Sequence, residues 1–561
     1  MNFLETIFQN LAELSDKPVL YEVREGRMVP TTARELSALI AAARKTLRRH
    51  GIQAGDRCVL LAPNSIQWVA LDLAIMAEGG IVVPLYSRQA PEELAAMILD
   101  CEPALVCCGS AELREAVLSR CPEELPCLLL PEMLAGSGDE GLPDLPAARP
   151  GSDVVTIIYT SGTSGDAKGV MLTLSNISFM LNPTCRRLDE LMADVTKTGD
   201  DRVFHYLPFC FAGSWILLLT CLHRKTPLMI STDLNRLADE LKVAAPHYFL
   251  NVPALLERIR NGVQTQLKEK GGIGLTLFRN GQSAWLRKQQ GGARAIDWLW
   301  LFLASKLVFS KIRAKIGPNL RALICGSAPL AEDAQLFFQM IGIPVLQVYG
   351  LTETTAICTL DDVHDVTVGR VGPAIPGIEM KLGRDQEILV RGPNIFPGYW
   401  RRPEATAEMI RDGWLHTGDQ GEVDEKGNWK IVGRIKNLLI TSGGHNVSPE
   451  PLEQRLQSAL PQAEHVMVVG NNRKFLCALV TGKHAEADVH KAVEELNRQL
   501  PHYRQIRRFL LCQEPFTPEN GLLTANRKLK RAAIEARYRR ELDELYREAE
   551  DRAGAASPSR S

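Results

Sequence analysis

Residues 55–86, GDRCVLLAPNSIQWVALDLAIMAEGGIVVPLY, constrain the possible folds most strongly. Two short apolar runs, 58–62 and 81–85, are typical of buried strands, and an apolar helical segment separates them. Buried strands joined through a helix indicate a parallel sheet with helices on both faces. The same order returns in RALICGSAPLAEDAQLFFQMI (321–341), and another strand follows at 344–349. The sequence therefore predicts a layered α/β fold with mostly parallel sheets.

The chain is too long for one domain. Its 561 residues exceed what a single hydrophobic core usually supports. Beyond Gly392 the expected strands become shorter and alternate in polarity, and residues 427–456 pass from a strand through a glycine loop into a helix. We expect a large N-terminal domain over 1–435, a small α+β domain over 436–553, and a disordered tail over 554–561.

Composition excludes several classes of function. The net charge is −1, so the chain as a whole does not attract nucleic acid. The 13 cysteines contain no CxxC pair, which argues against structural zinc and a disulfide framework and fits a reducing cytoplasm. The N-terminal residues MNFLETIFQNLAELSDK lack the basic start and cleavage site of a secretory signal. We expect a cytoplasmic protein.

Two long apolar stretches raise the question of membrane contact. Residues 206–222, YLPFCFAGSWILLLTCL, are slightly shorter than the ~20 residues of a membrane-spanning helix, and we expect them in the core. Residues 296–309, IDWLWLFLASKLVF, are rich in tryptophan and flanked by arginine and lysine. They fit either an interfacial membrane helix or a buried helix, and we favour burial.

A glycine- and hydroxyl-rich loop follows the expected strand at 154–159, within TIIYTSGTSGDAKGVMLT (156–173). Such a loop can direct backbone N–H groups, hydroxyls and one ammonium group at a phosphate. No Gly-Lys-Ser/Thr stands at the Walker spacing, which disfavours a P-loop phosphotransferase. A solvated turn between strands is the alternative. The candidate phosphate-binding residues are Thr160, Ser161, Gly162, Thr163, Ser164, Gly165 and Lys168.

Three further motifs follow this loop in order: YGLTETT (349–355), WLHTGDQGEVDEKGNWKIVGRIKN (414–437) and ENGLLTANRKLKR (519–531). In order and spacing, the four motifs resemble the adenylate-forming superfamily of acyl-CoA synthetases, nonribosomal adenylation domains and luciferases. Residues 252–270 and 305–330 are similar to the segment that long-chain fatty acyl-CoA synthetases carry before the adenine-binding strand. The resemblance covers nearly the whole chain.

This resemblance implies a two-step reaction. A fatty acid carboxylate attacks the α-phosphorus of MgATP, pyrophosphate leaves, and a thiol captures the acyl-AMP. The expected product is a medium- to long-chain acyl-CoA, made in the cytoplasm or loosely at the inner membrane face. One alternative acceptor is the phosphopantetheine arm of an acyl carrier protein. A second alternative, an inactive nucleotide-binding scaffold, is disfavoured because Lys168, Glu353, Asp419, Arg434 and Lys528 all occur together.

The resemblance also assigns roles around the nucleotide. Lys168 and the loop hydroxyls would hold the β- and γ-phosphates, Thr352 would contact phosphate, and Glu353 would help to place Mg²⁺. The remaining implied nucleotide-binding residues are Gly326, Ser327, Ala328 and Pro329 around the adenine, Tyr349 stacked on the base and followed by Gly350, Asp419 on the ribose hydroxyls, and Arg434 beside the ribose.

The small domain and the acyl pocket receive their roles in the same way. Lys528 would bridge the carboxylate and the α-phosphate, with Lys530 as the alternative if the register is shifted. Relatives rotate this mobile domain between the two steps about the residue that matches Lys436. The loop with Gly443 and Gly444 would then line the pantetheine channel. Phe211 and Trp215 would line the acyl pocket, with simple core packing as the alternative.

Overall fold

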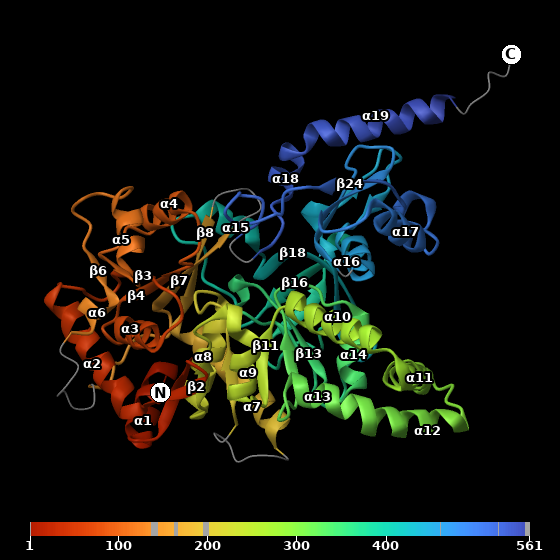
Figure 1. Cartoon of the computed structure of the whole chain (residues 1–561). Helices are drawn as coiled ribbons and strands as arrows, with labels where there is room; N and C mark the ends of the chain where they lie inside the picture. Colours follow the sequence, from red (N-terminus) through yellow and green to blue (C-terminus); the bar gives the residue numbers. More distant parts are fainter. Residues whose placement is uncertain are drawn as a thin grey trace.

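The computed structural model describes residues 2–135, 144–161, 167–193, 201–460, 462–524 and 527–555, without the side chains of Ser161 and of residues 549–555. It confirms a layered α/β fold with a large N-terminal and a small C-terminal domain (Figure 1). The last helix runs to Ala555, so Gly554 and Ala555 are helical rather than part of a tail. The remainder of the expected tail, residues 556–561, lies outside the described residues.

The first sheet has the strand order β6-β5-β3-β4-β7-β8. All neighbours are parallel except β7 and β8. Its strands are β3 (Arg57–Leu61), β4 (Ile81–Leu85), β5 (Leu105–Cys108), β6 (Cys127–Leu129), β7 (Val154–Ser161) and β8 (Ala167–Thr173). Its helices are α2 (Ala33–Arg49), α3 (Ile66–Ala77), α4 (Pro91–Cys101), α5 (Ala111–Leu118) and α6 (Leu130–Met133). The expected strand, helix and strand over 55–86 are therefore confirmed.

The second sheet has the order β14-β13-β12-β11-β9-β10-β1-β2, parallel except at its two edges. Its strands are β1 (Pro18–Arg24), β2 (Arg27–Thr32), β9 (Val203–His205), β10 (Leu228–Ile230), β11 (Tyr248–Asn251), β12 (Leu323–Cys325), β13 (Val345–Tyr349) and β14 (Thr359–Leu360). Its helices are α1 (Phe3–Leu14), α7 (Leu174–Met192), α8 (Ala212–Arg224), α9 (Leu237–Ala244), α10 (Pro253–Lys270) and α14 (Glu332–Met340). Most of α8 is buried, as expected for the apolar stretch at 206–222.

An antiparallel sheet follows the second parallel sheet in the chain. Its strands are β15 (Glu379–Leu382), β16 (Glu387–Arg391), β17 (Ile410–Arg411), β18 (Trp414–Val423) and β19 (Trp429–Arg434), with α15 (Pro403–Met409) between β16 and β17. The small pair β20 (Leu439–Ile440) and β21 (Asn446–Val447) comes next. This antiparallel region brings the end of β19 close to the carboxyl end of β13, which prepares the site described below.

The small domain lies at the upper right of Figure 1. It is built on a three-stranded sheet of β22 (Ala463–Val469), β23 (Leu476–Gly482) and β24 (Ile506–Cys512). Its helices are α16 (Glu450–Ala459), α17 (Glu486–Asn497), α18 (Arg531–Arg537) and α19 (Arg539–Ala555). Apolar side chains cover both faces of this sheet, because one cluster packs it against α16 and α17 and another against α18 and α19.

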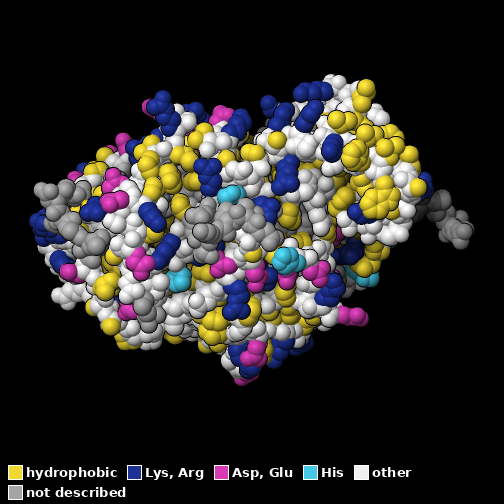
Figure 2. All heavy atoms as spheres, turned by 90° about the horizontal axis from the view of Figure 1, so that it is seen from below, with side chains coloured by type: hydrophobic (Ala, Val, Ile, Leu, Met, Phe, Trp, Pro, Cys, Tyr) yellow, Lys and Arg dark blue, Asp and Glu magenta, His cyan; other side chains and the backbone are white. Residues whose placement is uncertain are grey.

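A helical hairpin projects from the lower right of the large domain in Figure 1. It consists of α11 (Gly272–Gln289) and α12 (Ala295–Ala304), and the chain returns through a π-helical turn (Ser305–Phe309) and α13 (Ser310–Ile316). The prediction that residues 296–309 are buried is wrong for one whole face of α12, where large apolar side chains meet solvent. Figure 2 shows hydrophobic side chains gathered in this part of the molecule. Among the described helices, none is both long and apolar enough to span a membrane.

Candidate active site

A cavity of about 3300 Å³ lies between the two domains. Three predicted polar segments line it: the ends of the glycine-rich loop, the turn after β12, and the segment after β13. The first segment belongs to the six-stranded sheet and the other two belong to the eight-stranded sheet, so one cavity joins segments of two sheets.

The two ends of the glycine-rich loop lie opposite each other. Thr160 pairs with Lys168 in the antiparallel ladder of β7 and β8, and both residues line the cavity. The ladder therefore fixes the positions from which the loop leaves and returns. The predicted phosphate-binding residues Gly162, Thr163, Ser164 and Gly165, and the side chain of Ser161, lie outside the described part of the structure.

Glu353 is buried beside Lys168 at the end of β13. It belongs to a short 3-10 turn (Thr352–Thr354), and the Tyr399 hydroxyl donates a hydrogen bond of 2.7 Å to its Oε1 atom. The Lys168 ammonium lies 5.3 Å from the centre of the Tyr399 ring. Tyr399 thus contacts both residues: its hydroxyl donates to the Glu353 carboxylate, and its ring lies against the Lys168 ammonium. Tyr399 was not among the predicted site residues, since its only signal in the sequence is an aromatic pair after Pro-Gly.

The predicted adenine-binding residues line the same cavity, since Gly326, Ser327, Ala328, Pro329 and Tyr349 all face it. The backbone is close-packed here, because a Cβ atom on Gly350 would collide with the carbonyl oxygen of Ala356. Ser327 adopts a left-handed conformation with φ of 71°, which is uncommon for a residue with a side chain. Such strained turns cluster at ligand sites.

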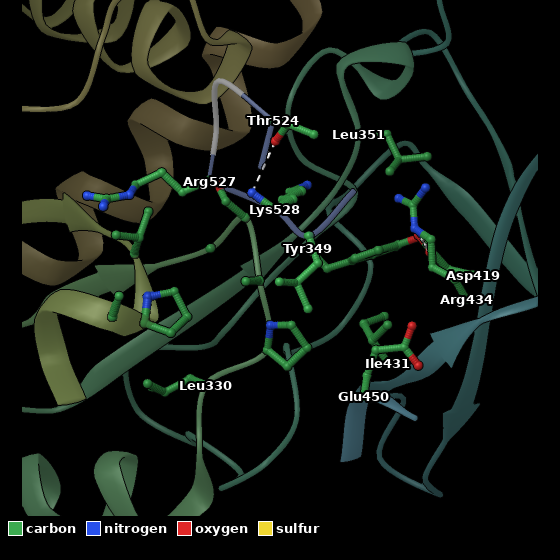
Figure 3. Close-up of a pocket in the computed structure, with 18 of the residues that line it drawn as sticks. Leu330, Tyr349, Leu351, Asp419, Ile431, Arg434, Glu450, Thr524, Arg527 and Lys528 are labelled. Carbon is green, nitrogen blue, oxygen red and sulfur yellow. Dashed lines mark hydrogen bonds and ion pairs between the residues drawn. The ribbon is translucent and has the colours of Figure 1, made fainter. Parts of the chain in front are cut away.

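Tyr349, Asp419 and Arg434 are joined by one hydrogen bond and one ion pair. The Tyr349 hydroxyl donates to Asp419 Oδ2 at 2.8 Å, and Arg434 Nε lies 2.8 Å from Asp419 Oδ1. Figure 3 shows Tyr349 reaching across the cavity toward these two residues. Burial would lower the pKa of Arg434, but Asp419, Tyr349, Glu353 and Glu450 outweigh it and raise that pKa. Arg434 therefore stays charged, and the carboxylate can still accept further hydrogen bonds because each oxygen has two acceptor sites.

Lys528 reaches this group from the small domain. Two hydrogen bonds to Thr524 hold its backbone: Thr524 N donates to the Lys528 carbonyl at 2.8 Å, and Lys528 N donates to Thr524 Oγ1 at 3.1 Å (Figure 3). Desolvation by the surrounding protein lowers the pKa of its ammonium group, and Arg434 lowers it further, while Asp419 and Glu353 oppose the change. The side chain nevertheless opens onto the cavity. Its charge is thus positioned to act on a ligand.

Lys530, the alternative to Lys528, has a different environment. Its ammonium lies 2.7 Å from Glu93 Oε1 on α4, which makes an ion pair between the two domains. Arg531, the next residue, donates to buried Glu453 and to the Val468 carbonyl, and so anchors the segment on the small domain. The geometry therefore favours Lys528 over Lys530 as the lysine that meets the ligand.

The predicted hinge and channel residues are divided between two locations. Lys436 lines the cavity, and its pKa is lowered by burial and by neighbouring Arg434. Gly443 and Gly444 instead lie in an exposed loop and do not line the cavity. In this arrangement of the domains, Lys528 faces the nucleotide residues and the glycine loop points to solvent.

The two aromatic residues predicted for the acyl pocket also lie in different places. Phe211 lines the cavity, and its ring centre is 5.7 Å from that of Tyr86. Trp215 lies in the core instead, where its Nε1 donates to buried Asp72 at 3.0 Å, so the structure does not support its predicted place in the pocket wall. The apolar lining includes Leu207, Pro208, Phe211, Leu217, Leu237 and Leu250.

Comparison with known proteins identifies the family. Residues 7–400 match the family described as AMP-binding enzyme, and residues 436–550 match the AMP-binding enzyme C-terminal domain. The long-chain-fatty-acid–CoA ligase FadD15 of Mycobacterium bovis is 29% identical, over 97% of this chain and 97% of its own. The chloroplastic long-chain-fatty-acid–[acyl-carrier-protein] ligase AEE15 of Arabidopsis thaliana is 27% identical, over 96% of this chain and 86% of its own.

A solved structure supports the same assignment. The ATP-bound MatB of Rhodopseudomonas palustris superposes with a TM-score of 0.72 at 25% identity, over 96% of this chain and 99% of its own. The two family matches together cover most of the chain; Tyr349 lies inside the first match, and Asp419 and Arg434 lie in the short stretch between the two. The protein belongs to the AMP-binding enzyme family.

Proposed function

We propose that the protein activates a medium- to long-chain fatty acid with ATP and transfers the acyl group to CoA. The observation that carries this proposal is that one cavity contains both the nucleotide residues and an apolar lining, with Lys528 opening onto it. An alkyl chain needs apolar walls, whereas a triphosphate needs cations and donors. The names of the relatives, a fatty acid–CoA ligase and a fatty acid–carrier protein ligase, support the same substrate class.

The first step requires positioning more than proton transfer. A fatty acid with a pKa of about 4 to 5 is already ionised at pH 7. One carboxylate oxygen attacks the α-phosphorus, the bond between the α-phosphorus and the bridging oxygen breaks, and pyrophosphate leaves with the electron pair. Lys528 would neutralise charge on the carboxylate and the α-phosphate, and Lys168 would neutralise it on the departing phosphates.

Glu353 fits the single protein carboxylate of a magnesium site. Mg²⁺ prefers oxygen ligands and is commonly held by one or two carboxylates together with substrate phosphates. Glu353 is buried, and one of its oxygens is engaged by Tyr399. When bound, Mg²⁺ would neutralise phosphate charge beside Lys168. Thr352, next to Glu353 on the cavity wall, would contact the phosphates.

The second step needs a different arrangement of the domains. A thiolate attacks the acyl carbon, the acyl–phosphate bond breaks, and AMP leaves. We propose that the small domain, residues 436–553, rotates about Lys436 between the steps. Rotation would withdraw Lys528 and bring the exposed loop with Gly443 and Gly444 to the cavity as the wall of a pantetheine channel. We further propose that the enzyme works in the cytoplasm and contacts a membrane peripherally.

A carrier protein is the alternative acceptor. CoA and a carrier protein present the same phosphopantetheine arm, and AEE15 is named for transfer to an acyl carrier protein. The purified chain should therefore be incubated with MgATP and fatty acids of many lengths, together with CoA, with loaded carrier protein, or with neither. Mass spectrometry would identify the products. Acyl-CoA of a defined length range is expected.

The other outcomes are equally informative. If acyl-AMP and acylated carrier protein form but no CoA ester does, the acceptor is the carrier protein and not CoA. No AMP formation with any acid would contradict the proposal and favour a nucleotide-binding scaffold. Isothermal titration of ATP would then test the scaffold directly.

A further inference from the structure

The outer face of α12 is apolar and exposed to solvent. Positions that recur at helical spacing point outward, while Asp297 and Ala304 point inward. Trp298 is 60% exposed and Phe302, one turn later, is 58% exposed. Together with Ile296, Leu299 and Leu307, which are all about half exposed, these residues form what we call the hairpin face. Contiguous exposed apolar surface of this kind marks an interaction site.

The hairpin face is held rigidly. Arg287 on α11 forms an ion pair with buried Asp297, with Nε 3.0 Å from Oδ2, and the Arg294 backbone N–H donates to the same carboxylate. Gly281 allows α11 to approach Ala304 so closely that a Cβ atom would collide with it. The outward residues are therefore presented by a fixed scaffold, and their exposure is built into the packing.

Cationic side chains surround the hairpin face. The Lys288 ammonium lies 4.9 Å from the centre of the Trp298 ring, and the Lys306 ammonium lies 5.4 Å from that of Phe302. Residues 271–317 contain eight arginines and lysines but only one carboxylate, Asp297, which is buried and already paired. This segment is thus strongly cationic in a chain whose net charge is −1.

We propose that the hairpin face docks on an anionic lipid bilayer. Tryptophan and phenylalanine side chains would enter the boundary between headgroups and acyl chains, while the surrounding lysines and arginines would meet lipid phosphates. A second copy of this chain fits less well, because it would bring an identical cationic rim against the first. The lysines and arginines around the hairpin face therefore favour an anionic partner. The exposed aromatic side chains favour a partner that has an apolar interior, as a lipid bilayer has.

Docking would also bring the cavity close to a source of fatty acid. Helix α10 lines the cavity with Leu255 and Arg258, ends at Lys270, and is followed directly after Gly271 by α11. The docked face on α12 is thus connected to the cavity wall on α10 through α11. This consequence rests on the proposed function, whereas docking itself rests only on the surface.

The experiment measures binding of the full chain to vesicles, without ATP or fatty acid. Large unilamellar vesicles of phosphatidylcholine with about 30% phosphatidylglycerol would be compared with pure phosphatidylcholine by flotation. The variant Trp298→Ser/Phe302→Ser should bind at least about tenfold more weakly, because it removes the apolar anchors. Lys288→Gln/Lys306→Gln should bind the anionic vesicles about tenfold more weakly and lose the preference over pure phosphatidylcholine.

Val29→Ser/Leu99→Ser is the matched control. It removes exposed apolar side chains from β2 and α4, where 41% and 50% of each residue is exposed, and it should bind like the unaltered chain. Thermal unfolding of every variant would verify that it folds. In a second measurement, brominated lipid should quench tryptophan fluorescence, and Trp298→Phe should remove most of this quenching while binding is retained.

Three outcomes would overturn the proposal: no binding of the unaltered chain to anionic vesicles, equal binding of Trp298→Ser/Phe302→Ser, or a dimer that this variant converts to a monomer. The last result would assign the surface to a second copy. Fatty acid ligation in detergent tests the proposed function separately. A chain that ligates without binding vesicles refutes docking alone, and one that binds vesicles without ligating refutes only the function.

Discussion

The nucleotide side of the cavity and its apolar lining are built in different ways. On the nucleotide side, polar groups fix one another before any ligand is present, as in the hydrogen bonds from Tyr349 to Asp419 and from Tyr399 to Glu353. The apolar lining is assembled from the segment before α8, from α8 and α9, and from β11, and these side chains only pack. We therefore expect chemistry to depend on a few exact contacts, and acyl selection to depend on shape summed over many residues.

The largest expected effect lies on the nucleotide side. Lys528→Ala should lower acyl-AMP formation by about 10²- to 10³-fold, because an ammonium group aimed at the developing charge is lost. Formation of thioester from supplied acyl-AMP should change by less than about threefold. Pyrophosphate release measures the first step and mass spectrometry of the thioester measures the second.

Lys530→Ala is the control for Lys528→Ala. Lys530 lies two residues away on the same segment, but its ammonium pairs with Glu93 in a partly exposed ion pair. Loss of such a pair costs at most about 1 kcal/mol, so adenylation should fall by less than about fivefold. Equal losses in Lys528→Ala and Lys530→Ala, or equal losses in both steps for Lys528→Ala, would contradict the assignment of Lys528.

A smaller effect is expected when a supporting contact on the nucleotide side is removed. Tyr399→Phe deletes the hydroxyl that donates to buried Glu353 and retains the ring beside Lys168. An unpaired buried carboxylate costs about 1 to 3 kcal/mol, so adenylation should fall about tenfold and need more Mg²⁺. Titration of the rate with Mg²⁺ measures this change. A normal rate with an unchanged Mg²⁺ dependence would mean that the contact only packs.

The same two regions differ in how far the sequence predicts them. The nucleotide motifs are contiguous, and strand ends place Thr352, Glu353 and Tyr349 at the cavity as expected. Tyr399 was missed because it is 46 residues from Glu353 and no local pattern joins them. Trp215 was misplaced because the orientation of a buried apolar helix such as α8 depends on its neighbours. The burial of α12 was mispredicted because an apolar sequence does not show whether the helix packs in the core or exposes one face to solvent.

The pH dependence of adenylation sharpens the role of Lys528. Desolvation and Arg434 lower the pKa of its ammonium, and only the protonated form can bridge two anions. Adenylation should therefore decline on the alkaline side at a pH below the ordinary lysine value of about 10.4. Arg434→Gln at saturating ATP should move this decline to higher pH, since a cation that lowers the pKa is gone. A decline that stays in place would assign it to another group.

The smallest expected effect on rate lies in the apolar lining, where one residue is a small part of a large surface. Phe211→Ala enlarges the lining and should raise kcat/KM for longer relative to shorter fatty acids by about fivefold, because one methylene in a fitted pocket is worth at least about 1 kcal/mol. Trp215→Phe should leave this ratio unchanged. It removes the donor to buried Asp72, so it should lower the free energy of unfolding by about 1 to 3 kcal/mol. Kinetics across a series of fatty acids and urea unfolding separate the two. If Trp215→Phe changes chain length preference without loss of stability, the cavity extends into the core beside α8, and the apolar lining is larger than the residues that now face it.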